Sequence, residues 1–268
     1  MFDAHHHLWD TSVRDYAWMD GPWADPLRGR FDVGRYRDEA APDGSIAVQA
    51  LHSEDETREL LAAGAPVAGV VGWTDLTAPG VADALAALPD GLVGIRHQVQ
   101  DEPDPGWLLR DDVRRGLRAV GEAGLVYDLL VRPPQADAAL DTVRALPGVM
   151  FVLDHAGKPD IAGGAWDPWA GWITALAALP NVTVKLSGLV TEAAPGWRDG
   201  DVLPYARHVL DAFGPSRLMY GSDWPVCTLA AAHARVAALA QSAVAGLSPH
   251  ERDQVFGGTA RRVYGIEG

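Results

Sequence analysis

Short apolar runs alternate with longer amphipathic segments along almost the whole chain. The apolar runs are rich in Val, Ile and Leu and end in polar residues or Gly, a pattern typical of buried β-strands. They predict eight strands, over residues 1–7, 45–51, 67–76, 92–100, 125–131, 150–155, 182–189 and 217–223. Most of the segments between them have helical spacing and predict helices over residues 54–63, 81–88, 113–123, 135–146, 168–179, 204–213 and 230–245.

Proline followed by Gly, Asp or Asn marks the ends of several predicted helices. Pro89, Pro147 and Pro180 each follow an apolar helix end and precede a predicted strand. Ser248 and Glu251 form a capping-box pattern that predicts a terminal helix. Eight alternating units favour a closed (β/α)8 TIM barrel of the α/β class, while an open doubly wound sheet, which usually has fewer strands, is the alternative.

The composition fits a single barrel-sized domain covering residues 1–268. Hydrophobic residues make up 48% of the chain and charged residues 22%, which is ordinary for a globular protein with a buried core. Acidic residues outnumber basic ones by 36 to 22, and the resulting charge of −14 repels phosphate backbones and anionic lipids. We therefore expect a small-molecule partner, and neither nucleic acid nor a membrane.

The sequence also carries indications of its compartment. Its single cysteine, Cys227, leaves no internal disulfide, which permits a reducing environment. It shows no apolar run of about 18 residues and no basic segment leading into an apolar stretch. We expect a cytoplasmic protein.

One long segment interrupts the alternation. Residues 10–44 follow the first predicted strand, are rich in Trp, Pro, Asp and Arg, and predict an irregular insertion where a barrel carries its active-site loops. Trp18, Trp23 and Trp224 are expected on this side of the barrel and could stack against a sugar-like ring. The tryptophans of the 166–172 segment are expected to pack around a helix start.

Polar side chains gather at the predicted strand ends, where barrel enzymes place their chemistry. Because side chains alternate along a strand, His5 and His7 share a face and His6 points the other way. His155 ends the sixth predicted strand and Asp223 the eighth. Such a set suits either a divalent metal held by imidazoles and a carboxylate or a metal-free acid–base cluster.

Further polar residues at strand ends allow two interpretations each. Arg96 suits a substrate oxygen or a structural salt bridge, and His97, on the opposite face, suits a substrate contact or packing outside the barrel. Lys185 lies in an apolar strand and needs an acidic partner or a place in the lumen. Asp128 could be a structural acid or a hydrogen-bond acceptor for substrate, and His52 could line the mouth or precede a plain helix N-terminus.

Five motifs spread along the chain resemble those of a known family. They are Asp3-Ala4-His5-His6-His7-Leu8-Trp9, Gly94-Ile95-Arg96-His97-Gln98-Val99-Gln100, Leu153-Asp154-His155-Ala156-Gly157-Lys158-Pro159, Lys185-Leu186-Ser187-Gly188-Leu189 and Gly221-Ser222-Asp223-Trp224-Pro225. As a set they resemble the amidohydrolase-related (amidohydrolase 2) lactonases, the family of L-fuconolactonases, L-rhamnonolactonases and 2-pyrone-4,6-dicarboxylate lactonases. The resemblance implies an amidohydrolase-like (β/α)8 barrel and hydrolysis of a small cyclic ester, such as a sugar-acid lactone.

The resemblance also implies roles for the residues at the strand ends. Asp223 would be the general base that activates water, and His155, with His5 and His7 or a metal they hold, would polarise the lactone carbonyl. The chain has no Lys suited to bridging two metals at the end of the fourth strand and no His on the fifth. The resemblance therefore implies that the enzyme either needs no metal or uses a single divalent ion such as Zn²⁺. His5, His7, His155 and Asp223 would hold that ion.

The remaining candidates would bind substrate. Arg96, His97 and Lys185 would contact its hydroxyl or carboxylate groups, and Trp18 or Trp224 would cover a ring face. Two other functions stay open on the same barrel: a metal-dependent amidohydrolase or decarboxylase, and a protein that only binds a ligand.

Overall fold

Eight parallel strands form the central sheet of the computed structural model, which describes residues 1–267. In spatial order they are β1 (Phe2–His6), β4 (Gly44–Val48), β5 (Val67–Gly72), β6 (Leu92–His97), β7 (Val126–Leu129), β8 (Phe151–Leu153), β9 (Val182–Leu186) and β10 (Leu218–Tyr220). The segment after β10 returns to β1, where the amide of Asp223 donates to His5 O at 2.8 Å and that of His7 to Trp224 O at 2.7 Å. These bonds bring the two edges of the sheet together into a barrel.

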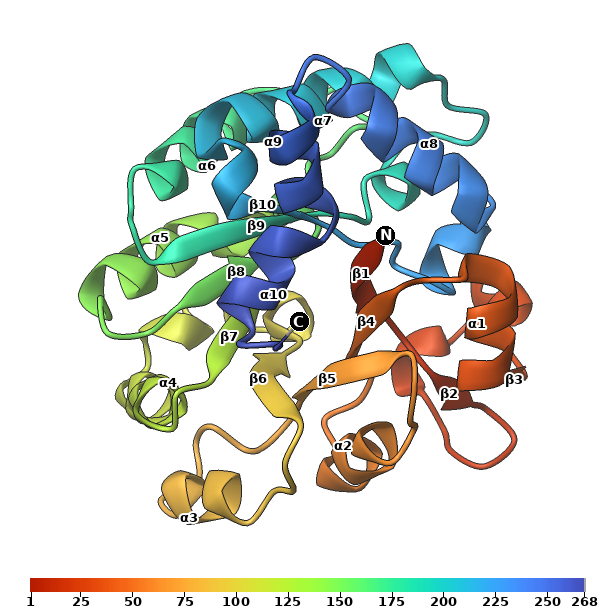
Figure 1. Ribbon diagram of the computed structural model, residues 1–268. Helices are drawn as coiled ribbons and strands as arrows, with labels where there is room; N and C mark the ends of the chain where they lie inside the picture. Colours follow the sequence, from red (N-terminus) through yellow and green to blue (C-terminus); the bar gives the residue numbers. More distant parts are fainter. Residues whose placement is uncertain (268) are drawn as a thin grey trace.

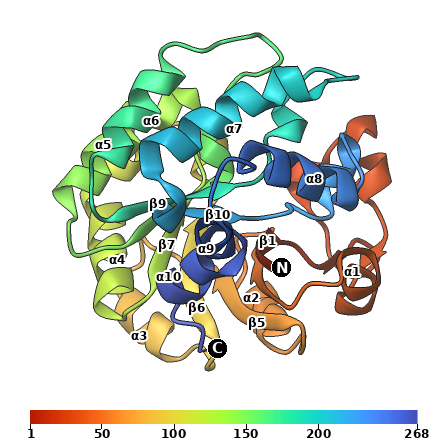
Figure 2. The same ribbon diagram turned by 45° about the horizontal axis from the view of Figure 1, so that its top comes forward.

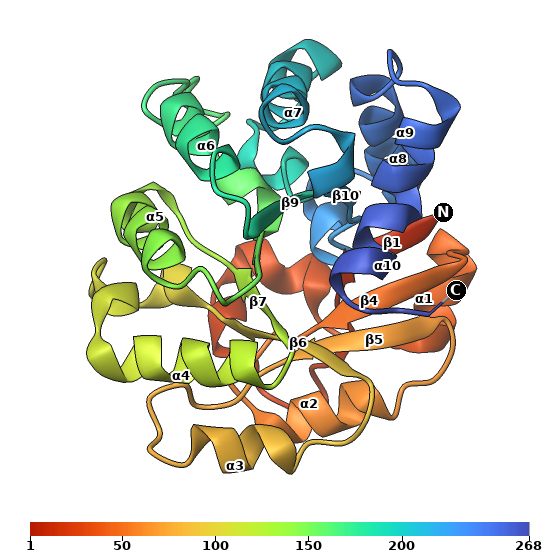
Figure 3. The same cartoon turned by 60° about the vertical axis from the view of Figure 1, so that its left-hand side comes forward.

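Helices connect successive strands and surround the barrel (Figures 1 and 3). They are α2 (Glu54–Leu61), α3 (Val81–Ala86), α4 (Asp111–Glu122), α5 (Ala136–Ala145), α6 (Trp169–Ala177), α7 (Asp199–Phe213) and α8 (His233–Ala243). The predicted (β/α)8 barrel is confirmed. The prediction that α7 begins at Pro204 is wrong: the helix begins five residues earlier, because Asp201 accepts from the amide of Arg198 at 2.8 Å and caps it there.

The insertion after β1 is more regular than predicted. It contains an antiparallel pair, β2 (Trp9–Asp10) and β3 (Arg30–Phe31), and the helix α1 (Val33–Ala40). The side chain of Asp32 caps α1 by accepting from the amide of Arg35 at 2.9 Å. The expectation of an irregular segment missed this Asp-x-x-Arg start, because the following turn has little apolar periodicity.

The barrel interior is apolar at the end where the strands begin. Alternate side chains of the strands, among them Phe2, Val126 and Val152, meet Ala260 and Tyr264 in one buried cluster. These last two come from the C-terminal segment, whose helices α9 (Pro249–Asp253) and α10 (Thr259–Val263) lie across this end of the barrel (Figure 2). The predicted capping box of Ser248 and Glu251 is present at the start of α9.

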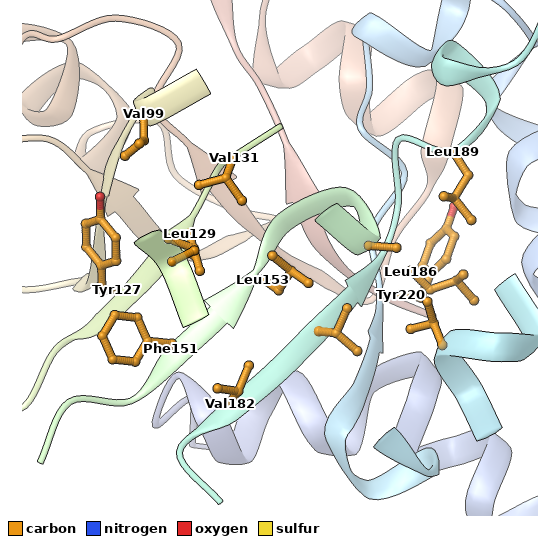
Figure 4. Packing of buried hydrophobic residues seen from close by; sticks show 14 of the residues in the cluster. Val99, Tyr127, Leu129, Val131, Phe151, Leu153, Val182, Leu186, Leu189 and Tyr220 are labelled. Carbon is orange, nitrogen blue, oxygen red and sulfur yellow. The ribbon is translucent and has the colours of Figure 1, made fainter. Parts of the chain in front are cut away.

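A second apolar layer separates the strands from the surrounding helices. Tyr127, Leu129, Phe151, Leu153 and Val182 point to this side of the sheet (Figure 4) and are fully buried. Because side chains alternate, their neighbours Asp128 and Asp154 point into the barrel instead. None of the helices in residues 1–267 combines the length and apolar character needed to span a bilayer.

Candidate active site

The first strand carries two histidines to the barrel mouth through a β-bulge. Between Asp3 and His6, β1 has one residue more than its partner β4, which changes the face that the following side chains occupy. His6 turns outward, and its ring stacks on Tyr36 with 3.8 Å between centroids. His5 and His7 point inward together, as alternation predicted, and their Nε2 atoms lie 3.2 Å apart.

A left-handed turn after β8 places His155. The φ angles of His155, Ala156 and Lys158 are 53°, 51° and 50°, in a region that residues other than Gly rarely adopt. Packing requires glycine at position 157 in this turn, since a Cβ on Gly157 would lie 2.2 Å from the Trp172 ring. Strain of this kind persists only where the surroundings impose it, and it is common at functional sites.

The loop after β10 places Asp223 above the three imidazoles. Asp223 also has a left-handed φ, of 58°. Its Oδ1 atom lies 3.5 Å from His7 Nε2, 3.8 Å from His5 Nε2 and 4.0 Å from His155 Nε2. The structure therefore brings together all four residues predicted at the centre of the site.

The surroundings favour an ionised carboxylate beside neutral imidazoles. Burial opposes ionisation of Asp223, but the neighbouring His155 and His7 outweigh it and hold the pKa of the carboxyl below its ordinary value. Burial lowers the pKa of His155 to about 4. Burial and the nearby Lys185 ammonium hold the pKa of His5 well below its usual range. Asp223 is thus the group in this cluster suited to accept a proton near neutral pH.

A layer of paired charges lies beneath the cluster. Arg96 donates to Asp154 Oδ2 at 2.9 Å, and Lys185 Nζ lies 3.0 Å from the other Asp154 oxygen. Lys185 also donates to Asp128, which accepts from the hydroxyl of Tyr264 at 2.8 Å. Each buried charge in this layer faces an opposite charge, which is what its burial requires.

The paired layer also reaches the histidine cluster. Lys185 Nζ lies 3.1 Å from His5 Nδ1, and Asp154 Oδ1 lies 3.3 Å from the same nitrogen. Burial opposes ionisation of Asp154, but Lys185, His5 and Arg96 outweigh it and hold the pKa of its carboxyl well below the ordinary value. Burial raises the pKa of Asp128 to about 6 despite its Lys185 partner.

A cavity of about 240 Å³ opens above the cluster. His7, His155 and Asp223 line its floor together with Arg96, while His5 lies just below, fully buried. Arg96 and Gln98 both face this cavity, as the alternation of β6 predicted. The cavity is large enough for a small ligand at the carboxyl ends of the strands.

The cavity walls differ in chemistry. Trp18 and Trp23, from the insertion, form an aromatic wall, and the indole of Trp18 is held by a 2.9 Å bond to Ala50 O. Gln98, Gln100 and Asp101 form a hydrogen-bonding wall. A third wall carries the cations of Arg132 and Lys158.

Two residues that were predicted to contact substrate, Trp224 and Lys185, lie away from the cavity. Trp224 is fully buried, donates to Glu39 at 2.8 Å and packs on Tyr36, so its expected place over a substrate ring is wrong. Lys185 does lie in the lumen with acidic partners, but below the site and fully buried, so it does not reach a ligand in the cavity.

His97 and His52 also lie outside the cavity. His97 stacks on Trp107 at 4.2 Å and on His52 at 4.0 Å, and its Nε2 lies 2.7 Å from Glu102, so the packing interpretation holds. Ser53 caps α2 by accepting from the amide of Glu56, which supports the helix-start interpretation next to His52.

Sequence reasoning missed several cavity residues. Lys158 stands in the same motif as His155, yet alternation says nothing about a side chain beyond the strand end. Arg132 follows the fifth strand by three residues, and a basic residue between Val131 and Pro133 was the available signal. Thr191 belongs to a loop that carried no signal.

The donor set fits a single divalent metal. His7 Nδ1 donates to Val48 O at 2.7 Å, because a carbonyl can only accept, and this leaves the Nε2 lone pair facing Asp223. His155 Nδ1 pairs with Ser187 Oγ at 2.9 Å, so its Nε2 is the ring nitrogen that faces Asp223. Ligand atoms of His5, His155 and Asp223 lie within 4.8 Å of one another. Imidazole nitrogens and a carboxylate are the ligands of catalytic zinc sites.

Fold and site together define a barrel with a buried carboxylate set among imidazoles at the carboxyl ends of its strands, where barrel enzymes carry their active sites. The amidohydrolase family pattern matches residues 2–266, and the chain belongs to this family. It is a hydrolase of the amidohydrolase superfamily.

Named relatives cover nearly the whole chain. It is 40% identical to an L-fucono-1,5-lactonase of Burkholderia multivorans, over 98% of this chain and 95% of that protein. It is 38% identical to an L-fucono-1,5-lactonase of Burkholderia ambifaria, over 99% and 95% respectively. A crystal structure of an amidohydrolase from Burkholderia multivorans with bound zinc superposes with a TM-score of 0.94 at 40% identity, covering 99% of each chain.

Proposed function

We propose that the protein is a lactonase that opens a small sugar-acid lactone to its hydroxy acid. The observation that carries the proposal is the Asp223 carboxylate on the cavity floor, with its Oδ1 atom within 4.0 Å of three imidazole nitrogens. An ionised base next to electrophilic groups is what attack of water on an ester carbonyl requires. The two L-fucono-1,5-lactonase relatives support this substrate class.

In the proposed reaction Asp223 accepts a proton from the attacking water. His7 is held in one tautomer by Val48 O, and His155 is oriented by Ser187, so the imidazoles keep fixed positions around the reacting carbonyl. His5, His7, His155 and Asp223 would hold a divalent ion, which when bound supplies positive charge for the carbonyl oxygen. Arg96, on the cavity floor, adds a fixed positive charge beneath the same region.

The walls suit the two faces of a sugar lactone. Such a ring presents C–H groups on its faces and hydroxyl groups around its edge. Trp18 and Trp23 offer aromatic surface to the C–H groups. Gln98, Gln100 and Asp101 offer donors and acceptors to the hydroxyl groups.

The experiment is a substrate panel followed with a pH indicator, since each opened lactone releases one proton. Aldono-1,5-lactones and aldono-1,4-lactones form the main arm. Simple amides and aromatic carboxylates form a second arm, which is followed by the release of ammonia and of carbon dioxide. Both arms are run on chelator-treated and on zinc-supplemented protein. We expect at least one aldonolactone to be opened well above the buffer rate. Turnover confined to the amide or carboxylate arm, or no turnover in either metal state, would contradict the proposal.

A further inference from the structure

Lysine is rare in this chain and occurs only inside the barrel mouth. Two of its 22 basic residues are lysines, Lys158 and Lys185, and all the others are arginines. Arginine keeps its proton at any working pH, whereas a lysine in a low-dielectric site can give one up. Among the arginine and lysine side chains of this chain, the two lysines are therefore the ones that can act as proton donors.

The left-handed turn after β8 directs Lys158 into the cavity. Lys158 ends the turn that His155 begins, and its amide closes the turn by donating to His155 O at 2.9 Å. Its side chain, 15% exposed, lines the same cavity as His155 and Asp223. The left-handed turn thus fixes an imidazole on the cavity floor and an ammonium group on a wall of the same cavity.

The ammonium group of Lys158 keeps its hydrogen-bonding capacity free. The nearest carboxylate is Glu192, with Oε1 3.7 Å from Nζ, beyond hydrogen-bond distance. Glu192 is shared with Arg132, whose NH1 lies 3.7 Å from Oε2. Among residues 1–267 the structure records no hydrogen bond from Lys158 Nζ, so its three N–H groups are available to a ligand.

The ring-opening step of the proposed reaction needs a proton for the leaving oxygen, which either protonated Asp223 or a second group could supply. When the ring opens, the C–O bond breaks and its electron pair goes to the ring oxygen, which leaves as an alkoxide unless it is protonated. Asp223 is at that moment carrying the proton taken from water. A second group on the cavity wall that donates a proton would assist the bond cleavage.

We propose that Lys158 is the general acid that protonates the ring oxygen as the lactone opens; this rests on the proposed lactonase function. Water loses one proton to Asp223 and forms the new C–O bond, the ring C–O bond breaks, and Lys158 Nζ gives one proton to the ring oxygen. The product is a carboxylic acid with a free hydroxyl group. Asp223 then loses its proton, Lys158 regains one, and the product carboxyl releases one proton to solvent.

The surroundings of Lys158 support this role independently of the cavity geometry. Burial lowers the pKa of Lys158, partly offset by Glu192 and Asp223, while Arg132 and Arg96 lower it further. A less basic ammonium group is a better proton donor near neutral pH. Glu192 keeps the group charged until the ring oxygen needs the proton.

Two substitutions separate proton donation from charge. Lys158→Met removes both the proton and the charge at similar length, whereas Lys158→Arg keeps the charge but cannot donate a proton at working pH. On the best aldonolactone of the panel, we expect both variants to lose about 10²–10⁴-fold in kcat. Arg37→Met, an exposed substitution of a basic residue outside the site, is the control and should keep the wild-type rate.

Each outcome decides the inference. A Lys158→Met loss below threefold overturns the assignment, because neither the charge nor the proton of Lys158 would then be needed. A Lys158→Arg rate above one third of wild type also overturns it, because the charge alone would then suffice. Urea midpoints within 0.3 M of wild type exclude unfolding as the cause of a loss. If wild-type protein opens no lactone at all, the proposed function fails. That result is distinct from a wild-type protein that is active and whose Lys158 variants keep their rate.

A direct readout uses the rarity of lysine. Protein labelled with ¹³C at the lysine ε position gives two side-chain signals, and Lys158→Met assigns them. We expect the Lys158 signal to titrate below the ordinary lysine range and to match the alkaline limb of the kcat profile, which Lys158→Met should lack. A Lys158 signal that titrates above that limb would overturn the assignment of the limb to this residue.

Discussion

Two layers of polar residues cross the barrel interior, built from the same residue types but paired to different degrees. In the lower layer Lys185 contacts Asp128, Asp154 and His5 within hydrogen-bond or ion-pair distance and is fully buried. In the upper layer Lys158 stands 3.7 Å from its nearest carboxylate and faces the cavity. A buried charge whose hydrogen bonds are all made stabilises the fold. A charge in a cavity whose N–H groups have no partner is available to contact a substrate.

The same contrast separates the two sets of carboxylates. Asp154 and Asp128 are engaged by Arg96, Lys185 and the Tyr264 hydroxyl. Within residues 1–267, the ion-pair partners recorded for Asp223 are imidazoles, and its carboxylate borders the open cavity. Substitutions in the lower layer should therefore act on stability first, and substitutions in the upper layer on turnover.

The largest expected effect is on stability, from Lys185→Met. Removing this ammonium leaves Asp128 and Asp154 as buried carboxylates without their main partner, which costs about 3–5 kcal/mol. Urea denaturation followed by tryptophan fluorescence measures the loss, and Arg37→Met serves as the exposed control. A Lys185→Met protein as stable as wild type would show that the lower layer is not held by this pair.

The pH dependence of stability should show that His155 is a neutral imidazole in the folded protein. The pKa of His155 is about 4 in the folded protein, below the ordinary value of 6.5, so between these values the unfolded chain binds one proton more. Stability should therefore fall as pH drops from 6.5 to 4, and His155 alone contributes about 1.4 kcal/mol per pH unit within that window.

The variant His155→Gln tests this assignment. The free energy of unfolding of this variant should fall less steeply between pH 6.5 and 4 than that of wild type, by about 1.4 kcal/mol per pH unit. Urea unfolding of chelator-treated samples across the pH range measures this. Equal slopes in wild type and variant would mean that His155 is protonated in the folded state. That result would remove the neutral imidazole from the account of the upper layer.

The smallest expected effect concerns substrate binding by the aromatic wall. Trp18→Leu removes the indole from the cavity and should raise KM for the best lactone about tenfold, with kcat changed little, since about 1.4 kcal/mol of contact energy corresponds to that factor. Steady-state kinetics measure both constants. An unchanged KM would place the substrate away from the insertion.

Much of this arrangement followed from strand alternation. It predicted the barrel, the shared face of His5 and His7, the inward Arg96 and the outward His97, because each of these residues lies within a strand or directly at its end, and the bulge in β1 precedes the step from His5 to His7. It did not place Lys158 or Trp224, since these stand in turns whose direction depends on left-handed residues and on packing against distant segments. It did not place Arg132 either, because this residue lies beyond the end of its strand. The lower layer was only partly visible, because the pairing of Asp128 with Tyr264 joins residues 136 positions apart.

The measurement that bears most directly on the upper layer compares Asp223→Asn with wild type in turnover and in stability on the same samples. We predict a loss of about 10²–10⁴-fold in kcat for lactone opening, since the amide cannot accept the proton of water. The urea midpoint should fall less than in Lys185→Met, and it should not rise, because the lowered pKa of Asp223 means that the folded protein favours its charge. An Asp223→Asn protein that opens the lactone as fast as wild type would contradict the assignment of Asp223 as the base.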